Sequence, residues 1–172
     1  MKKIIIYNSK SGFTKRYAEL IKDELNCELV NFKNIKKVNL NDYKSIIYGG
    51  GIYASKINGL NKIKDIVSDS QNLIIFGVGL SKKTNKLIEE IKEANFDNFK
   101  DYKFFYFRGG FNYENLNFIN KIIIWVFKKI LNSKKDKDKK EKMFLESIRK
   151  NSDYLDKDKI TPLIQYFNKV ND

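Results

Sequence analysis

Apolar runs and segments with helical spacing alternate along this chain. Lys2–Tyr7 is an apolar run with isoleucines at its centre, which is typical of a buried strand. From about Thr14 to Leu25 the apolar residues recur every three or four positions and share one face of a helix. Further strands are predicted near Glu28–Phe32, Ser45–Gly49, Asn72–Val78 and Lys103–Phe107. Further helices are predicted at about Asn58–Ser68, Lys83–Ala94 and from Thr161, where threonine can cap and Pro162 takes the first helical position.

This alternation predicts a single α/β domain over residues 1–172. Strands joined by helical crossovers form a parallel sheet with helices on both faces, which is a three-layer sandwich. The five predicted strands favour the order 2-1-3-4-5. A length of 172 residues is enough for a substantial core, and 42% hydrophobic residues is ordinary for a globular chain.

A helical insertion, from Gly109 to about Lys159, follows the fifth strand and breaks the alternation. It contains a strongly apolar predicted helix centred on Ile122–Phe127, and a second predicted helix over about Glu141–Lys150. Residues 134–142, between the two, carry six lysines and three acidic residues. The insertion therefore combines a strongly apolar predicted helix with a basic run.

The apolar helix of the insertion allows two interpretations. It packs on its own domain as half of a helical hairpin, or it leaves some of Trp125, Phe127 and Ile130 exposed to dock on a membrane surface or a redox partner. Its longest apolar run is far below the roughly 20 residues that span a bilayer. The N-terminal apolar segment is only a strand long, and no small-residue cleavage site follows it. We expect a cytoplasmic protein, with peripheral contact of residues 117–142 to the inner face of the membrane as an open alternative.

The amino-acid composition argues against several kinds of functional site. The chain has no histidine, and its only cysteine, Cys27, is expected to be a small buried thiol. Disulfides and thiolate metal clusters are excluded, and we predict no metal site and no catalytic side chain. Lysine is frequent throughout, so much of the net charge of +13 belongs to solvated surface. Aromatic residues do not interleave with basic ones as in a nucleic-acid stacking platform, so no nucleic-acid partner is predicted.

The segment between the first strand and the first helix is a candidate phosphate site. It reads Ser9-Lys10-Ser11-Gly12-Phe13-Thr14, and it offers hydroxyls, backbone N–H groups and a helix N-terminus to one point. The Walker and dinucleotide patterns need two and three glycines, and only one is present. The alternative is an ordinary strand–helix turn with Ser/Thr capping.

Two glycine-rich segments follow the third and fourth strands, and in a parallel sheet they end at the same edge as the candidate phosphate site. The first, Gly49-Gly50-Gly51-Ile52-Tyr53-Ala54-Ser55, would let a planar ligand approach the backbone and stack on Tyr53. The second is Gly77-Val78-Gly79-Leu80-Ser81. The predicted binding residues are Ser9, Lys10, Ser11, Gly12, Phe13, Thr14, Gly50, Gly51, Ile52, Tyr53, Ala54, Gly77, Val78, Gly79, Leu80 and Ser81.

These segments together resemble the flavodoxin superfamily. Ser9, Ser11, Gly12 and Thr14 occupy the fixed positions of its phosphate loop, Thr/Ser-x-Thr/Ser-Gly-x-Thr, and Phe13 stands where the family often has Asn. The resemblance implies a flavodoxin-like fold that binds FMN. It places the phosphate in the first segment and the isoalloxazine ring between the other two.

More narrowly, Gly49–Tyr53, Phe107–Tyr113 and the basic insertion resemble the branch with the flavodoxin-type, menaquinone-dependent protoporphyrinogen oxidases. The resemblance implies an FMN-binding protein that transfers electrons through its flavin. Two alternatives stay open: a quinone-coupled protoporphyrinogen oxidase of heme biosynthesis, which would be an FMN-dependent oxidoreductase, and an interaction domain without FMN.

The expected partners are an acidic reductase, a quinone or a small-molecule substrate, because electron-shuttling flavodoxins are generally acidic and this chain is basic. The oligomeric state is not indicated.

Overall fold

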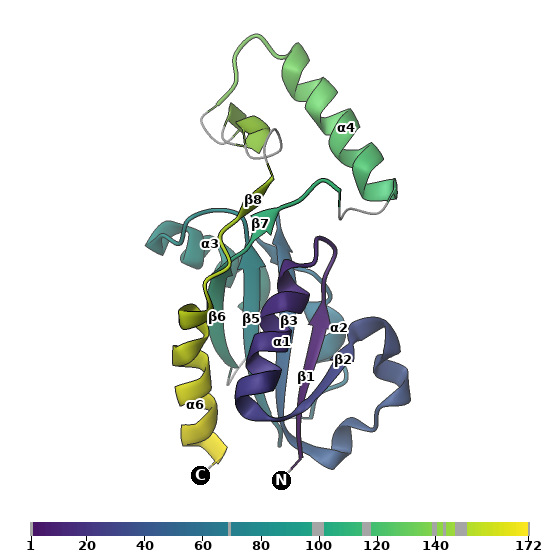
Figure 1. Cartoon of the computed structure of the whole chain (residues 1–172), viewed down its shortest axis with the longest axis vertical. Coiled ribbons are helices and arrows are strands. Elements are labelled where there is room, and N and C mark those ends of the chain that lie inside the picture. Colours follow the sequence, from purple (N-terminus) through teal and green to yellow (C-terminus); the bar gives the residue numbers. More distant parts are fainter. Residues whose placement is uncertain are drawn as a thin grey trace.

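The computed structural model describes residues 2–68, 70–97, 102–114, 118–138, 141–142, 144–146 and 151–171. A parallel sheet lies at its centre in the order β2-β1-β3-β5-β6 (Figure 1). These strands are β1 (Lys2–Asn8), β2 (Glu28–Asn31), β3 (Tyr43–Tyr53), β5 (Asn72–Gly79) and β6 (Tyr102–Arg108). The short strand β4 (Lys56–Ile57) pairs antiparallel with the end of β3. The order 2-1-3-4-5 expected for the parallel strands is confirmed.

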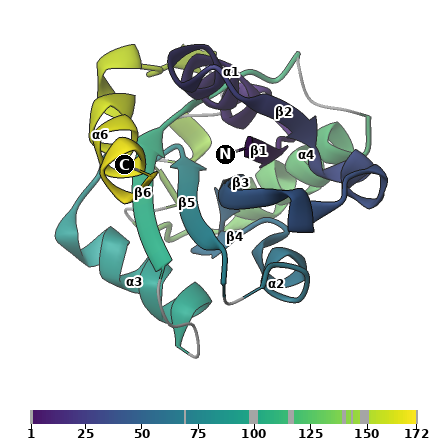
Figure 2. The same cartoon turned by 90° about the horizontal axis from the view of Figure 1, so that it is seen from below.

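Helices cover both faces of the sheet. Figure 2 shows α1 (Phe13–Leu25) and α6 (Thr161–Asn171) on one face, and α2 (Leu60–Lys64) and α3 (Asn85–Phe96) on the other. The described residues also form three short 3₁₀ turns: η1 (Phe32–Lys37), η2 (Leu40–Asp42) and η3 (Lys157–Ile160). The three-layer arrangement follows from strands that are apolar on both sides and therefore need cover on both.

The isoleucines of β1 show how the two cores form. Ile4 and Ile6 point to the α2–α3 side and Ile5 points to the α1–α6 side, because successive side chains of a strand alternate between faces. All three are fully buried. The same alternation recurs in β3 and β5, so each face of the sheet carries its own continuous apolar cluster.

Two expected element boundaries were wrong. The third strand does not end at Gly49 but continues to Tyr53, where it turns into β4. Thr161 is not a cap, because its backbone is already helical and η3 runs directly into α6. The cap lies upstream, where the Asp156 carboxylate accepts a hydrogen bond from the Asp158 N–H at 3.0 Å.

The predicted helix at Asn58–Ser68 is shorter in the structure, where α2 covers only Leu60–Lys64. The reason is local: the Asn58 N–H donates to the Gly51 carbonyl at 2.9 Å, so Asn58 belongs to the turn after β4.

The insertion leaves and rejoins the domain through a two-stranded ladder of β7 (Gly110–Phe111) and β8 (Ser152–Asp153). Between them lies α4 (Phe118–Ser133), which is separated from the sheet in Figure 1. Of the second predicted helix, residues 141–142 and 144–146 are helical, and residues 143 and 147–150 lie outside the described residues. Among the helices that the structure describes, none combines the length and apolarity needed to cross a membrane.

Candidate functional site

The candidate site lies at the carboxyl edge of the sheet, which we define as the edge where the parallel strands end. The segment after β1 reaches this edge first. Gly12 has φ 91°, a backbone conformation that glycine adopts without strain, and its N–H donates to Ser9 Oγ at 3.1 Å. Helix α1 then starts with no side chain capping it and no acidic residue in its first turn. The first amides of α1 are therefore available to an anion.

Thr14 connects this segment to the next one. Its side chain is buried, and its Oγ1 lies 3.6 Å from the point where a Cβ on Gly51 would stand. The strand register also places Asn8 opposite Gly50, and Gly51 opposite Val78. The three predicted segments thus meet at the carboxyl edge.

Most glycines of the second and third segments have a packing role that sequence reasoning did not identify. A Cβ on Gly49 would strike the Phe76 ring, and one on Gly50 would lie 2.5 Å from Ile57 Cγ2. Likewise, a Cβ on Gly77 would lie 2.6 Å from Ile52 Cδ1, and one on Gly79 would lie 2.7 Å from the Tyr106 hydroxyl oxygen. The space beside these four glycines is filled by the protein itself.

Gly51 differs from these glycines. A Cβ there would make only ordinary contacts, at 3.5 Å from Asn58 Nδ2 and 3.6 Å from Thr14 Oγ1. Tyr53, two residues on, is 65% exposed. A tight turn follows, with Ala54 and Ser55 at φ 47° and 61°. Gly51 and Tyr53 are therefore the residues of this segment best placed to meet a planar ligand.

The third segment is tied to β6. The Leu80 carbonyl accepts a hydrogen bond from Arg108 Nε at 3.1 Å, and the Ser81 carbonyl accepts one from the Tyr106 hydroxyl at 2.5 Å. Burial raises the pKa of Tyr106 to about 12, so this hydroxyl keeps its proton at neutral pH and remains a donor. Of the predicted residues, Lys10 and Ser81 are exposed.

Phe13 plays a different part from its neighbours in the motif. It is buried, and its ring lies against the turn at Gly109 and Gly110. A Cβ on Gly110 would lie 2.5 Å from Phe13 Cζ. The aromatic residue that departs from the family pattern therefore packs under the base of the insertion.

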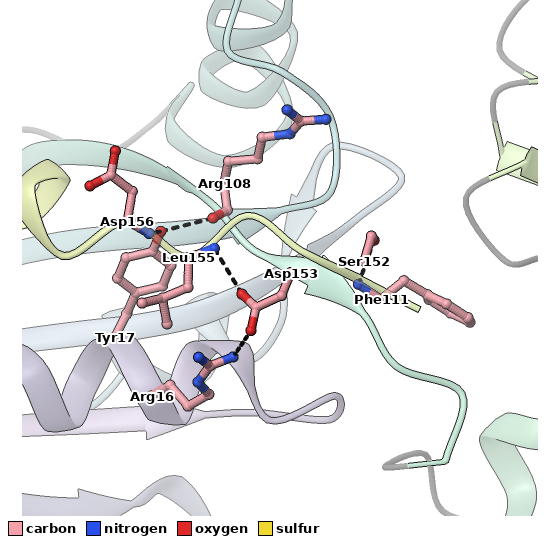
Figure 3. A network of polar contacts seen from close by, with 8 residues as sticks. All are labelled: Arg16, Tyr17, Arg108, Phe111, Ser152, Asp153, Leu155 and Asp156. Atoms are coloured by element: carbon pink, nitrogen blue, oxygen red, sulfur yellow. Dashed lines mark hydrogen bonds and ion pairs between the residues drawn. The ribbon is translucent and has the colours of Figure 1, made fainter. Parts of the chain in front are cut away.

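A polar network joins α1 to the strand where the insertion returns (Figure 3). Arg16 Nη1 pairs with Asp153 Oδ2 at 2.6 Å, and the Leu155 N–H donates to Asp153 Oδ1 at 3.0 Å. Burial acts to raise the pKa of Asp153, but the hydrogen bonds from Arg16 and from the Leu155 N–H outweigh it and leave this pKa below its ordinary value. Asp153 is therefore a carboxylate at neutral pH.

Tyr17 holds the neighbouring part of this network. Its hydroxyl donates to the Arg108 carbonyl at 2.8 Å and accepts from the Asp156 N–H at 3.1 Å. Burial is the main cause of its raised pKa. Tyr17 thus fastens α1, the end of β6 and the returning chain at one point, which sequence reasoning missed because these residues are far apart in the sequence.

A small pocket of about 160 Å³ lies between the first segment and the base of the insertion. Its lining includes Ser11, Gly12, Arg16, Phe111 and Asn112. Of the residues that line this pocket, sequence reasoning placed Ser11, Gly12 and Phe13 in a site. It did not include Phe111 and Asn112, although the Gly-Gly-Phe-Asn run after β6 was part of the observed resemblance.

Two further observations concern metal-binding groups and the single thiol. In the residues that the structure describes, no three His, Cys, Asp or Glu side chains gather in a way that could hold a metal ion. Cys27 is half-buried, and burial raises its pKa to about 11, so the thiol stays protonated at neutral pH.

Comparison with known proteins identifies the family. A family model described as a flavodoxin domain matches residues 4–138. No curated protein sequence matches the chain significantly.

Similar solved structures include a flavoprotein from Bacteroides eggerthii, with 14% identity, a TM-score of 0.47, and coverage of 73% of this chain and 95% of that one. The Trp repressor binding protein from Bacillus subtilis has 16% identity, a TM-score of 0.45, and coverage of 64% of this chain and 85% of that one. A flavoprotein in complex with FMN from Lactobacillus acidophilus has 15% identity, a TM-score of 0.42, and coverage of 62% of this chain and 91% of that one.

Proposed function

Because the chain belongs to the flavodoxin-domain family, we propose that it binds FMN at the carboxyl edge and transfers electrons through the bound flavin. The observation that carries this proposal is the meeting of Thr14 with Gly51, which joins a hydroxyl-rich, uncapped helix N-terminus to an open glycine. FMN combines a phosphate monoester with a planar ring, and the two halves of the site offer what each needs.

The residues present fit the phosphate. Ser9, Ser11 and Thr14 supply hydroxyls, and the first turn of α1 supplies N–H groups that no side chain caps. That turn has no acidic residue, so the positive end of the helix dipole favours an anion there. Under this proposal these groups hold the phosphate, and Lys10 adds a further cation from the solvent side.

The residues present also fit the ring. Gly51 leaves room for close approach, and exposed Tyr53 offers an aromatic face for stacking. The backbone of Val78, which pairs with Gly51 in the sheet, and of Leu80 would border the opposite side. When bound, the flavin supplies the redox chemistry, while these residues orient the ring and exclude water from it.

A titration of the purified protein with FMN, followed by flavin fluorescence and visible absorption, tests the proposal. Replacing Ser11 and Thr14 together by alanine removes two phosphate donors, and we expect FMN affinity to fall by at least about tenfold. The matched control is Ser68→Ala with Ser70→Ala, which removes two exposed hydroxyls from the opposite edge of the sheet. If both double variants retain FMN equally, the phosphate site is wrong. If the wild-type protein binds no FMN, the chain acts instead as an interaction domain.

A quinone-coupled protoporphyrinogen oxidase is the second candidate function. The feature that favours it is the basic charge of the chain, net +13, which suits a substrate with carboxylate groups better than it suits a basic electron-transfer partner. Mixing the FMN-loaded protein with protoporphyrinogen and a menaquinone analogue, and following porphyrin fluorescence, separates the two. Turnover supports the enzyme, whereas flavin reduction by an acidic reductase without porphyrin formation supports the carrier.

A further inference from the structure

We propose that α4 is an interfacial anchor that docks the protein on the surface of anionic lipid bilayers. The helix presents an apolar face to solvent: Ile122, Ile123, Val126 and Ile130 are between 42% and 52% exposed. Their spacing places them on one side of the helix. Another side of α4 packs against the protein itself: Leu131 is 2% exposed, and the Phe127 ring lies 5.4 Å from that of Phe144. The helix is thus supported from one side and open on the other.

The borders of this apolar face carry the residues that suit a lipid–water interface. Trp125 is 58% exposed, and Lys129 Nζ lies 5.3 Å from the centre of its ring. At the start of the helix, Lys121 Nζ lies 5.5 Å from the centre of the Tyr113 ring. Aromatic rings with adjacent ammonium groups fit the headgroup region, where the ring is half-buried and the lysine reaches the phosphates.

Charge selects the kind of surface. Residues 118–142 contain nine lysines against three acidic residues. One of these acids, Glu141, is already paired with Lys134 at 2.6 Å, whereas Lys128, Lys129 and Lys135 are exposed. A basic segment beside an exposed apolar helix is attracted to anionic headgroups and then held by apolar burial.

Other occupants of this face fit less well. Two copies of α4 in contact would bring two lysine-rich segments together, and like charges repel. A transmembrane role is also unsuitable, because α4 is 16 residues long and has lysines within it. An anionic bilayer surface would bury the apolar face of α4 and at the same time attract its lysines to the headgroups.

Docking through α4 would also orient the domain. Figure 1 shows α4 beyond the carboxyl edge of the sheet, on the side where α1 begins. A bilayer bound there would lie on the same side of the protein as the proposed FMN site. The docking itself needs no flavin, so its test and the test of FMN binding fail independently.

Trp125 is the only tryptophan of the chain and reports directly on docking. The full-length protein is mixed with phosphatidylcholine vesicles with and without phosphatidylglycerol. With phosphatidylglycerol, we expect the Trp125 emission to shift to the blue and to become protected from iodide quenching. Co-sedimentation should show at least about tenfold stronger binding to the anionic vesicles, weakened by salt. An unshifted emission with anionic vesicles would overturn the proposal.

Two sets of variants separate the apolar and the charged parts. Replacing Ile122, Val126 and Ile130 together by serine should reduce vesicle binding by at least about tenfold. The control Ile66→Ser, at an exposed isoleucine after α2, should bind like the wild type.

Replacing Lys128, Lys129 and Lys135 by glutamine should weaken binding by roughly a hundredfold. The charge-matched control replaces Lys33, Lys36 and Lys37, which are exposed on η1.

Equal losses in the two lysine variants would mean general attraction by net charge and would overturn the role of α4. A wild-type protein that elutes as a dimer, and becomes monomeric in the triple serine variant, would assign the apolar face to a second copy instead. Binding that is lost only in the α4 variants supports the anchor.

Discussion

Isoleucine serves opposite purposes in the sheet and in α4. In β1, Ile4, Ile5 and Ile6 are fully buried, and their alternation divides the core between the two faces. In α4, Ile122 and Ile130 are about half exposed, at 45% and 51%. The residue type is the same in both places, so the difference lies in what covers each side chain. In the sheet the apolar residues stabilise the fold, whereas in α4 they remain available to bind something else.

The largest expected effect tests this difference directly. Ile5→Ala should lower the free energy of unfolding by about 2–5 kcal/mol, because it leaves a cavity in a close-packed core. Ile122→Ala should change it by no more than about 0.5 kcal/mol. Urea denaturation followed by circular dichroism measures both. A loss at Ile122 as large as that at Ile5 would mean that α4 packs on the domain in solution.

The glycines of β3 sharpen the comparison on a smaller scale. Gly49→Ala should cost about 1–3 kcal/mol of stability, because the added methyl strikes the Phe76 ring. Gly51→Ala meets only ordinary contacts and should leave the free energy of unfolding near that of the wild type. Under the proposed function, however, it should weaken FMN binding. Urea denaturation and FMN titration of both variants separate packing glycines from a ligand-facing one.

The smallest expected effect concerns the fastening of the insertion to the domain. Arg16→Gln breaks the pair with Asp153, whose side chains are both about half exposed, so we expect a loss of only about 0.2–1 kcal/mol. The pKa of Asp153 is lowered in the folded protein, so the stabilisation is present above the pKa of an unfolded aspartate. It disappears as the pH falls through the folded pKa, where wild type and variant should converge.

Urea denaturation across acidic pH measures this convergence. The matched control is Lys15→Gln, which breaks an exposed pair with Glu19 within α1. This pair does not involve the insertion. A stability difference between wild type and Arg16→Gln that persists at low pH would contradict the assignment to Asp153.

The parallel sheet could be predicted from the sequence because its strands are short, almost wholly apolar runs separated by helical spacing. Ile4–Ile6 and Asn72–Val78 carry that signal without ambiguity. The order of the strands followed from the helical crossovers between them. The exposure of Trp125, Phe127 and Ile130, which the sequence left as one of two alternatives, is confirmed.

The errors have a common physical origin. Gly49–Gly51 suggested a loop, yet these residues continue β3. Gly49 and Gly50 are needed there because Phe76 and Ile57 fill the space that their side chains would occupy. Nothing in the local sequence reveals a partner that lies across the sheet. The pairing of β7 with β8 was missed for the same reason, since two-residue strands have no periodicity and their partners are about 40 residues apart.

The pairing of Gly110 with Asp153 has a consequence for the construction of the chain. It brings the two ends of residues 112–151 to the spacing of adjacent strands, roughly 5 Å. A turn of a few residues could bridge that gap without moving β6 or α6. The whole segment is thus a detachable module, and because the entropic cost of closing a loop rises only slowly with its length, it can be shortened, extended or exchanged while the register of the sheet stays as it is.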